Sequence, residues 1–274
     1  EAKISVFDSG FLLGDGVWEG IRLHQSTLVF IEEHINRLFA SAKGISLDIP
    51  LSRQDIINEL NKVLIKNHMN DDVHIRLIVS RGDKITPYQN PNANVGTINF
   101  VIIPEYKKTN PDTYIQGISI GRVPNTRPNE NILSPQYNTL SKLNCILASI
   151  EANKLGYDEG IMNDINGNIS TCNSTNLFFI QDNQVITSKG EYCLNGITRG
   201  KVIEVCHENN IQCNKINFTF KDIENCDEVF VTGTFAGIVP VAKLENKELK
   251  STNPSSMVNK IRKLYNKKIE EYIG

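Results

Sequence analysis

The sequence predicts a protein of two domains that mixes helices and strands, of the α+β or α/β class, and three observations lead there. The chain has 274 residues, which exceeds one average domain and suffices for two modest cores. Its first third combines amphipathic helical patterns with runs of β-branched residues. A segment rich in proline and asparagine then precedes a second set of elements. We expect a small α+β domain at residues 1–118, an interdomain linker region at 119–136 and a larger domain at 137–274.

Helices and strands alternate in the first domain. Apolar residues recur at helical spacing in 34–45 and again in 53–67, so both segments are predicted to be amphipathic helices. Residues 27–31, 73–80 and 97–103 are rich in β-branched side chains and are predicted to be strands. The opening residues also resemble a strand, and because the chain starts without Met we expect a short segment to precede them.

The second domain follows a linker that contains Pro124, Pro128 and Pro135, a composition that favours neither a helix nor an inner strand. Beyond it, strands are predicted at 176–180 and 228–232. Helices are predicted at 199–209 and where four apolar residues share one helical face: Leu143, Ile146, Leu147 and Ile150. The last helix has a start signal in Asn253 as N-cap and Pro254 at the first helical position.

Composition excludes several classes of partner and site. The formal net charge is -2, so no basic field favours nucleic acid. No apolar run approaches the roughly 20 residues that cross a bilayer, and no secretory signal is seen, so we expect no membrane partner and a cytoplasmic location. The six cysteines include no Cys-x-x-Cys pair and no zinc-like spacing to histidine, which predicts reduced thiols and no metal site.

Two glycine-bearing turns could bind an anion. Residues 194–200 pass from a loop into a helix, so the N–H groups of Ile197 and Thr198 lie at the positive end of the helix dipole. Residues 232–237, with Gly233 and Thr234, follow a strand and offer backbone N–H groups again. Each turn taken singly is ordinary, and a single lysine or arginine is usually a solvated cation, so composition and spacing alone identify no activity.

Read together, however, these segments resemble the class IV aminotransferases, the family of branched-chain aminotransferases, D-amino acid aminotransferases and aminodeoxychorismate lyase. The resemblance covers almost the whole chain. Its motifs are Phe7-Asp8-Ser9-Gly10, Leu13 to Arg22, Glu33 to Leu38, Ser80-Arg81-Gly82, Leu140 to Asn144, Gly196 to Arg199 and Thr232 to Pro240.

The resemblance implies the D-amino acid aminotransferase-like fold type IV, pyridoxal 5'-phosphate as cofactor, and a homodimer. It places the cofactor-carrying lysine at Lys142, which would also move the substrate Cα proton, on a helix of the second domain. It implies phosphate binding by five further residues: Arg37, Ile197, Thr198, Gly233 and Thr234. The N–H groups of Thr234 and Phe235 would bind the substrate carboxylate. Arg81 would either do the same or belong to a solvated loop.

One position departs from the family pattern. Where the family has a glutamate that pairs with the cofactor's ring nitrogen, this chain has Thr171, whose hydroxyl carries no charge. The leading prediction is a transaminase acting between an amino acid and a 2-oxo acid, most like the branched-chain enzymes, because the segment around Trp18 most resembles theirs. A D-amino acid aminotransferase, a lyase of the aminodeoxychorismate lyase type and a low-activity cofactor-binding descendant remain alternatives. L or D stereochemistry stays open.

Overall fold

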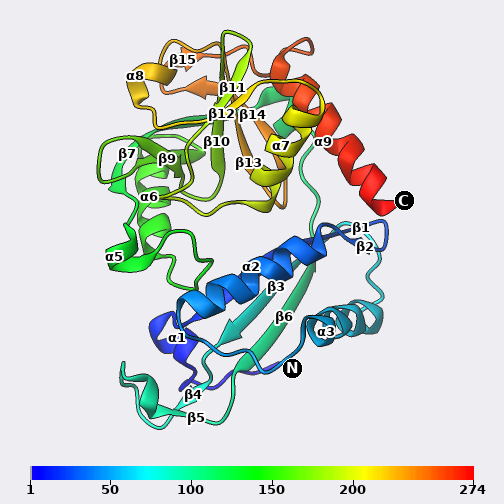
Figure 1. The fold of residues 1–274 in the computed structure, drawn as a ribbon, viewed down its shortest axis with the longest axis vertical. Coiled ribbons are helices and arrows are strands. Elements are labelled where there is room, and N and C mark those ends of the chain that lie inside the picture. Colours follow the sequence, from blue (N-terminus) through cyan, green and yellow to red (C-terminus); the bar gives the residue numbers. More distant parts are fainter. Residues whose placement is uncertain (1) are drawn as a thin grey trace. The chain divides into compact units, whose positions relative to one another are not determined.

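The computed structural model describes residues Ala2–Gly274, and the chain divides into two compact units (Figure 1). Unit 1 takes the chain up to Lys108 together with Tyr137–Lys142; unit 2 takes Thr109–Gln136 and Leu143–Gly274. The expected boundaries differ from this division in two places. Residues 109–118 join unit 2, and 137–142 join unit 1, because each segment is held by strands of that unit.

Unit 1 is built on a four-stranded antiparallel sheet in the order β2-β1-β3-β6. The strands of this sheet are β1 (Gly16–His24), β2 (Thr27–Leu28), β3 (Val73–Ser80) and β6 (Asn99–Tyr106). Two helices, α2 (Ile31–Gly44) and α3 (Arg53–Lys66), share its core. The smaller elements are α1 (Ser9–Leu13), β4 (Asp83–Lys84), η1 (Pro91–Ala93) and β5 (Asn94–Val95).

Alternation along the strands decides which face of the sheet the helices cover. Val17 and Ile21 on β1 are fully buried, as are Ile75 and Leu77 on β3. They pack with apolar residues of both helices in one cluster, so the next residues along each strand face the other side. The expected strand at 73–80 and both helices are confirmed, whereas the strand expected at 27–31 shortens to Thr27–Leu28 because α2 begins at Ile31.

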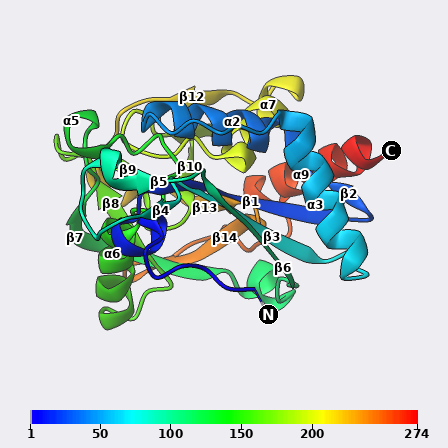
Figure 2. The same ribbon diagram turned by 90° about the horizontal axis from the view of Figure 1, so that it is seen from below.

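Unit 2 contains a larger mixed sheet in the order β12-β11-β10-β13-β14-β7-β8-β9, with β15 paired to β14. Its strands are β7 (Ile118–Thr126), β8 (Glu159–Asn163), β9 (Ile169–Cys172), β10 (Asn176–Gln181), β11 (Gln184–Thr187), β12 (Cys213–Lys215), β13 (Glu228–Gly233), β14 (Gly237–Leu244) and β15 (Lys247–Glu248). Its helices are α4 (Asp112–Gln116), α5 (Glu130–Leu133), α6 (Leu143–Lys154), α7 (Ile197–Glu208), α8 (Phe220–Ile223) and α9 (Met257–Ile273). Helix α6 packs on β7 and β8, and Figures 1 and 2 show it well apart from α7 and α9, which pack toward β13.

Two expectations for unit 2 were wrong. Part of the expected linker forms β7, an inner strand between β14 and β8. Its proline, Pro124, lies where the pairing with β8 shifts register between Arg122 and Thr126. The regular hydrogen-bond ladder is interrupted there, so the missing N–H of a proline is tolerated. The last helix begins at Met257 with Ser256 as its N-cap, and Asn253 instead organises the preceding turn by accepting from the Ser255 N–H.

Among residues 2–274, no helix combines the length and the apolar character that crossing a bilayer requires.

Candidate active site

One face of the unit 1 sheet gathers an indole ring and two cations. Trp18 follows the buried Val17 on β1, so its side chain lies on the face away from α2 and α3. Arg76, paired with the neighbouring Gly20 across β1 and β3, places its guanidinium carbon 3.9 Å from the indole ring centroid. The Lys142 Nζ lies 5.8 Å from the same centroid. Both cations thus approach the single tryptophan of the chain.

Lys142 reaches this face because its segment pairs with the edge of β1. The Trp18 N–H donates to Asn138 O at 3.0 Å, and the Leu140 N–H donates to Gly16 O at 2.9 Å. Val17 and Thr139 form the bridge between these two bonds. Lys142 therefore lies on an extended segment of unit 1, one residue before α6 begins at Leu143, and not on a helix of the second domain as expected.

Arg37 is held in place by a buried carboxylate. Its Nε and Nη2 donate to the two oxygens of Glu19 at 2.8 and 2.7 Å, and His34 Nδ1 lies 2.7 Å from one of them. Burial alone would raise the pKa of Glu19, but the Arg37 charge and hydrogen bonds, with those of His34, hold this pKa below its usual value. The Arg37 side chain remains 14% exposed, so its orientation is fixed while part of it still reaches the surface.

Arg81 forms an ion pair and two further hydrogen bonds inside unit 1. Its guanidinium donates to both carboxylate oxygens of Asp15 at 2.7 and 2.9 Å and to the carbonyl oxygens of Ser46 and Ile45 at 2.8 Å each. These bonds tie the segment after α1 to the turn after α2. Arg81 therefore stabilises unit 1, and substrate binding by Arg81 stays a prediction.

In unit 2 the two glycine-bearing turns meet at one end of neighbouring strands. Asn176 begins β10 and pairs with Thr232 near the end of β13, where the turn 232–237 starts. The Asn176 Nδ2 donates to Leu194 O at 2.9 Å, which fixes the turn that leads into α7. Gly196 leaves room for this side chain, since a Cβ at this position would lie 2.3 Å from the Asn176 Oδ1 and would force it to move. Register and one side chain thus place both turns together.

The arrangement leaves donors available at this end of the sheet. Helix α7 has Gly196 as its N-cap, with no side-chain cap and no acidic residue in its first turn. The Ile197 and Thr198 N–H groups belong to the four that a helix cannot satisfy internally. Thr232 is 2% exposed, and its Oγ1 has no hydrogen-bond partner among the described residues. A helix N-terminus without a capping side chain, next to a buried hydroxyl without a hydrogen-bond partner, fits a phosphate group. Thr234 and Phe235 lie half-buried in the adjoining turn.

Thr171 lies at the same end of the sheet but offers no charge. Its hydroxyl donates to Thr175 O at 2.6 Å, and the Asn176 Nδ2 approaches its Oγ1 at 3.5 Å. The side chain is 5% exposed. Its proton is therefore committed to the loop that follows β9, and only the oxygen lone pairs remain for another partner.

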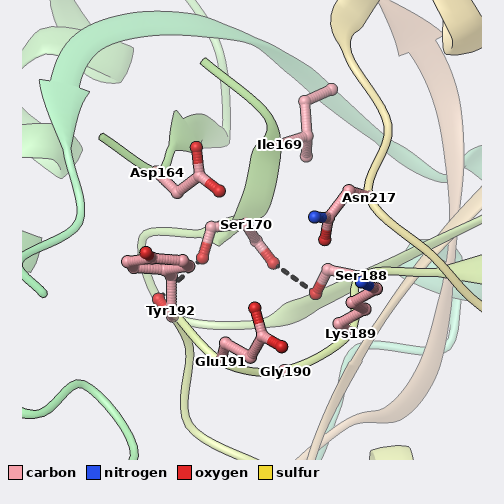
Figure 3. A pocket seen from close by; sticks show the side chains of 9 residues that line it. All are labelled: Asp164, Ile169, Ser170, Ser188, Lys189, Gly190, Glu191, Tyr192 and Asn217. Atoms are coloured by element: carbon pink, nitrogen blue, oxygen red, sulfur yellow. Dashed lines mark hydrogen bonds between the residues drawn. The ribbon is translucent and has the colours of Figure 1, made fainter. Parts of the chain in front are cut away.

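Figure 3 shows a cleft beside this region that does not belong to the site. It has room for about one water molecule. Its two serine hydroxyls are already hydrogen-bonded: Ser188 Oγ donates to Ser170 O, and Ser170 Oγ donates to Tyr192 O, both at 2.7 Å. A group of cofactor size has no place there.

Sequence reasoning missed Glu19, Arg76 and Asn138 as individual residues of the site. The signal for Glu19 was present, because a charged residue stands between Val17 and Ile21 at an inward position of an alternating strand. Arg76 and Asn138 carry no such signal. Their positions follow from strand pairing across distant parts of the chain.

Comparison with known proteins identifies the family of this chain. The family model described as amino-transferase class IV matches residues 16–244. The chain is 33% identical to the branched-chain-amino-acid aminotransferase-like protein 2 of Arabidopsis thaliana over 97% of its own length, and it spans about half, 47%, of that relative. It is 28% identical to a D-alanine aminotransferase of Listeria monocytogenes, covering 100% of this chain and 93% of the relative.

Among solved structures, the branched-chain aminotransferase of Thermoproteus uzoniensis with norvaline superposes with a TM-score of 0.88. The two share 24% identity over 98% of this chain and 90% of that one, which establishes the shared fold type IV. The family match over most of the chain, together with the 33% identity to the Arabidopsis relative, shows that the chain belongs to the class IV aminotransferases.

Proposed function

We propose that this chain binds pyridoxal 5'-phosphate and transfers an amino group between an amino acid and a 2-oxo acid. The observation that carries the proposal is the uncapped start of α7 beside the orphaned Thr232 hydroxyl, in a chain of this family. Ile197, Thr198, Gly233 and Thr234 would bind the cofactor phosphate, and Arg37 would add its charge. When bound, the cofactor supplies a ring that accepts electrons from the substrate.

Lys142 is the proposed catalytic residue. It is half-buried, its Nζ lies beside the Trp18 ring, and its segment is fixed by pairing with β1. An amine held in this way can carry the cofactor covalently and can afterwards move a proton from the substrate Cα. The half-buried Trp18 ring supplies apolar surface on the same face, which favours an apolar substrate such as a branched-chain amino acid.

One observation favours a second candidate, a descendant that binds the cofactor but turns over slowly. Thr171 donates its hydroxyl proton to Thr175 O, and a threonine cannot hold the ring nitrogen protonated as a carboxylate does. A lyase that uses the same cofactor would also lack a carboxylate at position 171 to protonate the ring nitrogen. Rate measurements separate these candidates from an efficient transaminase.

The test is a spectrum of the purified protein, borohydride reduction and peptide mapping. We expect absorbance near the visible edge, loss of that band on reduction, and a covalent adduct on Lys142. Lys142→Ala should abolish the adduct. Lys154→Ala should not, because Lys154 is exposed and pairs with Glu151 on the outside of α6. An adduct on another lysine would overturn the assignment of Lys142.

Substrate class follows from the same preparation. L- and D-amino acids, branched and unbranched, are added in turn while the shift from the aldehyde to the amine form is recorded. We expect branched-chain amino acids to react fastest. A preference for D-alanine would favour the D-amino acid alternative, and release of pyruvate from aminodeoxychorismate, added separately, would favour the lyase.

We also propose a homodimer, because α6 presents an apolar stripe to solvent. Leu143, Ile146, Leu147 and Ile150 are 66%, 52%, 46% and 43% exposed, while Ala148 and Ala152 pack inward. An exposed stripe of this kind is typical of an interface. Light scattering should give twice the chain mass, and Ile146→Lys should weaken the dimer. A monomer at working concentration would contradict the proposal.

A cytoplasmic location is proposed as well, in keeping with cysteines that are all unpaired in the described chain. Cell fractionation tests it.

A further inference from the structure

The side chain of Asn138 carries a buried acceptor without a partner. Asn138 is 1% exposed, its backbone N–H donates to Ser41 Oγ at 3.0 Å, and its Nδ2 donates to Trp18 O at 2.6 Å. Because a carbonyl oxygen only accepts, the bond to Trp18 fixes which end of the amide is nitrogen. The other end, Oδ1, has no hydrogen-bond partner among the described residues. Burial of an unsatisfied acceptor is costly, so a bound group that donates to it is expected.

Strand pairing places this acceptor on the face that carries Trp18. Val17 belongs to the core shared with the helices of unit 1, and the buried Thr139, its bridge partner, lies on the same face. Side chains alternate along extended segments, so Asn138 lies on the opposite face with Trp18. Lys142, four residues further along the same segment, returns to this face, as its distance to the Trp18 ring confirms. Asn138 and Lys142 therefore lie on the same face of the unit 1 sheet, with Asn138 buried beneath it.

We propose that Asn138 Oδ1 accepts a hydrogen bond from the amino group of the bound ligand, that is, from the amine of the substrate or of the aminated cofactor. The inference rests on the proposed function, and it assigns Asn138 as a residue that binds and positions the reacting end. The surroundings favour an amine, because Arg76 and Lys142 on this face are both donors and Asn138 Oδ1 is a buried acceptor without a partner among the described residues.

The first experiment compares two ligands that differ only at this group. Pyridoxamine 5'-phosphate carries the amine, and 4-deoxypyridoxine 5'-phosphate carries a methyl group in its place. Quenching of Trp18, the only tryptophan, reports binding. In Asn138→Leu we expect the preference for the amine ligand to fall by roughly tenfold or more, as loss of a hydrogen bond to a charged group predicts.

Thr139→Val is the matched control, because Thr139 is equally buried, adjacent in the chain and turned to the other face. It should leave the preference unchanged. An Asn138→Leu protein that binds both ligands with the wild-type preference overturns the proposal and means that a buried water satisfies Oδ1 instead. Wild type that binds neither ligand overturns the proposed function, and the inference with it.

A second variant tests where the reacting end of the cofactor lies, and not how tightly the ligand binds. If the reacting end lies against Asn138, an amine introduced by Asn138→Lys should capture pyridoxal 5'-phosphate, and borohydride should fix an adduct on residue 138. Ser141→Lys is the control: Ser141 is exposed, and its Oγ donates to Gly14 O. Circular dichroism confirms that each variant is folded. A folded Asn138→Lys protein that binds the cofactor with all adduct elsewhere overturns the proposal; an unfolded one leaves the decision to Asn138→Leu.

Discussion

At the scale of single residues, the site of unit 1 depends on polar groups inside a core. Glu19 is fully buried and accepts from Arg37 and His34. Removing one partner of such a buried ion pair typically costs about 3–5 kcal/mol, because the other charge is left without compensation. The same pair orients Arg37 toward the surface. A residue that stabilises the fold thus also fixes the direction of a proposed phosphate ligand.

Thr171→Glu should raise the rate of amino-group transfer by about tenfold or more, if electron demand limits turnover. A carboxylate there would keep the ring nitrogen protonated, and a protonated ring would accept electrons from the substrate more readily. The larger side chain also crowds a buried position, which alone costs about 1–3 kcal/mol of stability. Thr171→Gln matches the size without the charge. Stopped-flow measurement of the half-reaction decides: equal rates in the Glu and Gln variants would mean that this account of position 171 is wrong.

His74 should make stability depend on pH. Burial first, and then the nearby charges of Lys107 and Arg76, lower its pKa from 6.5 to about 4. The folded protein therefore binds this proton less readily than the unfolded chain. The contribution of His74 to the free energy of unfolding is complete above pH 6.5. It is lost as the pH drops toward 4, which lowers the free energy of unfolding by roughly 1–2 kcal/mol after allowance for solvent screening.

Urea unfolding at pH 7, 5.5 and 4.5 measures this effect. His74→Asn should flatten the dependence in that window, whereas His68→Asn, at an exposed turn, should retain the wild-type slope. A slope unchanged by His74→Asn would assign the dependence to other groups.

At the scale of elements, local patterns predicted most helices and several strands. Residues 73–80 alternate cleanly and pair as β3 over that range. The failures lie where tertiary contacts override local preference. Pro124 is tolerated in β7 because a register shift removes the demand for its N–H. In α6 the small residues Ala148 and Ala152 face the sheet, and the large apolar residues face outward.

The candidate site was predictable to a similar degree. The two glycine-bearing turns are local features, and the structure places them together. Asn138 was not predictable from local pattern, because its significance arises from pairing with β1, 120 residues away in the sequence.

Ser256→Ala should destabilise the protein by about 1 kcal/mol through the loss of the α9 N-cap. The Ser256 Oγ accepts from the Asn259 N–H at 3.1 Å and also donates to Ser251 O at 3.0 Å, so the effect should lie at the upper end of the usual range. Asn253→Ala is the informative comparison, because local pattern predicted the cap there. Equal or greater destabilisation by Asn253→Ala in thermal unfolding would contradict the assignment of Ser256.

At the scale of the whole molecule, the chain passes between its two units three times, after Lys108, Gln136 and Lys142. The short segment Tyr137–Lys142 is part of unit 1 although its neighbours on both sides belong to unit 2. Its place at the edge of β1 means that unit 1 cannot be completed until residues far along the chain have been made. Folding of unit 1 therefore depends on a non-local contact.

A fragment ending at Lys108 should accordingly be much less stable than the same fragment with residues 137–142 joined through a flexible Gly/Ser linker. The added segment restores the bonds that Trp18 makes to Asn138 and Thr139, and those of Leu140 to Gly16 and of Asn138 to Ser41. At about 1 kcal/mol for each hydrogen bond, the gain amounts to several kcal/mol before the entropy of closing the linker is subtracted. Leu140→Pro in the added segment is the control, because it removes the N–H that donates to Gly16 while it leaves the fragment's length unchanged. We expect the urea midpoint to rise with the added segment and to fall back with Leu140→Pro. Equal midpoints for all three fragments would mean that the edge of β1 stands without this segment, and that the position of Lys142 is maintained from outside unit 1.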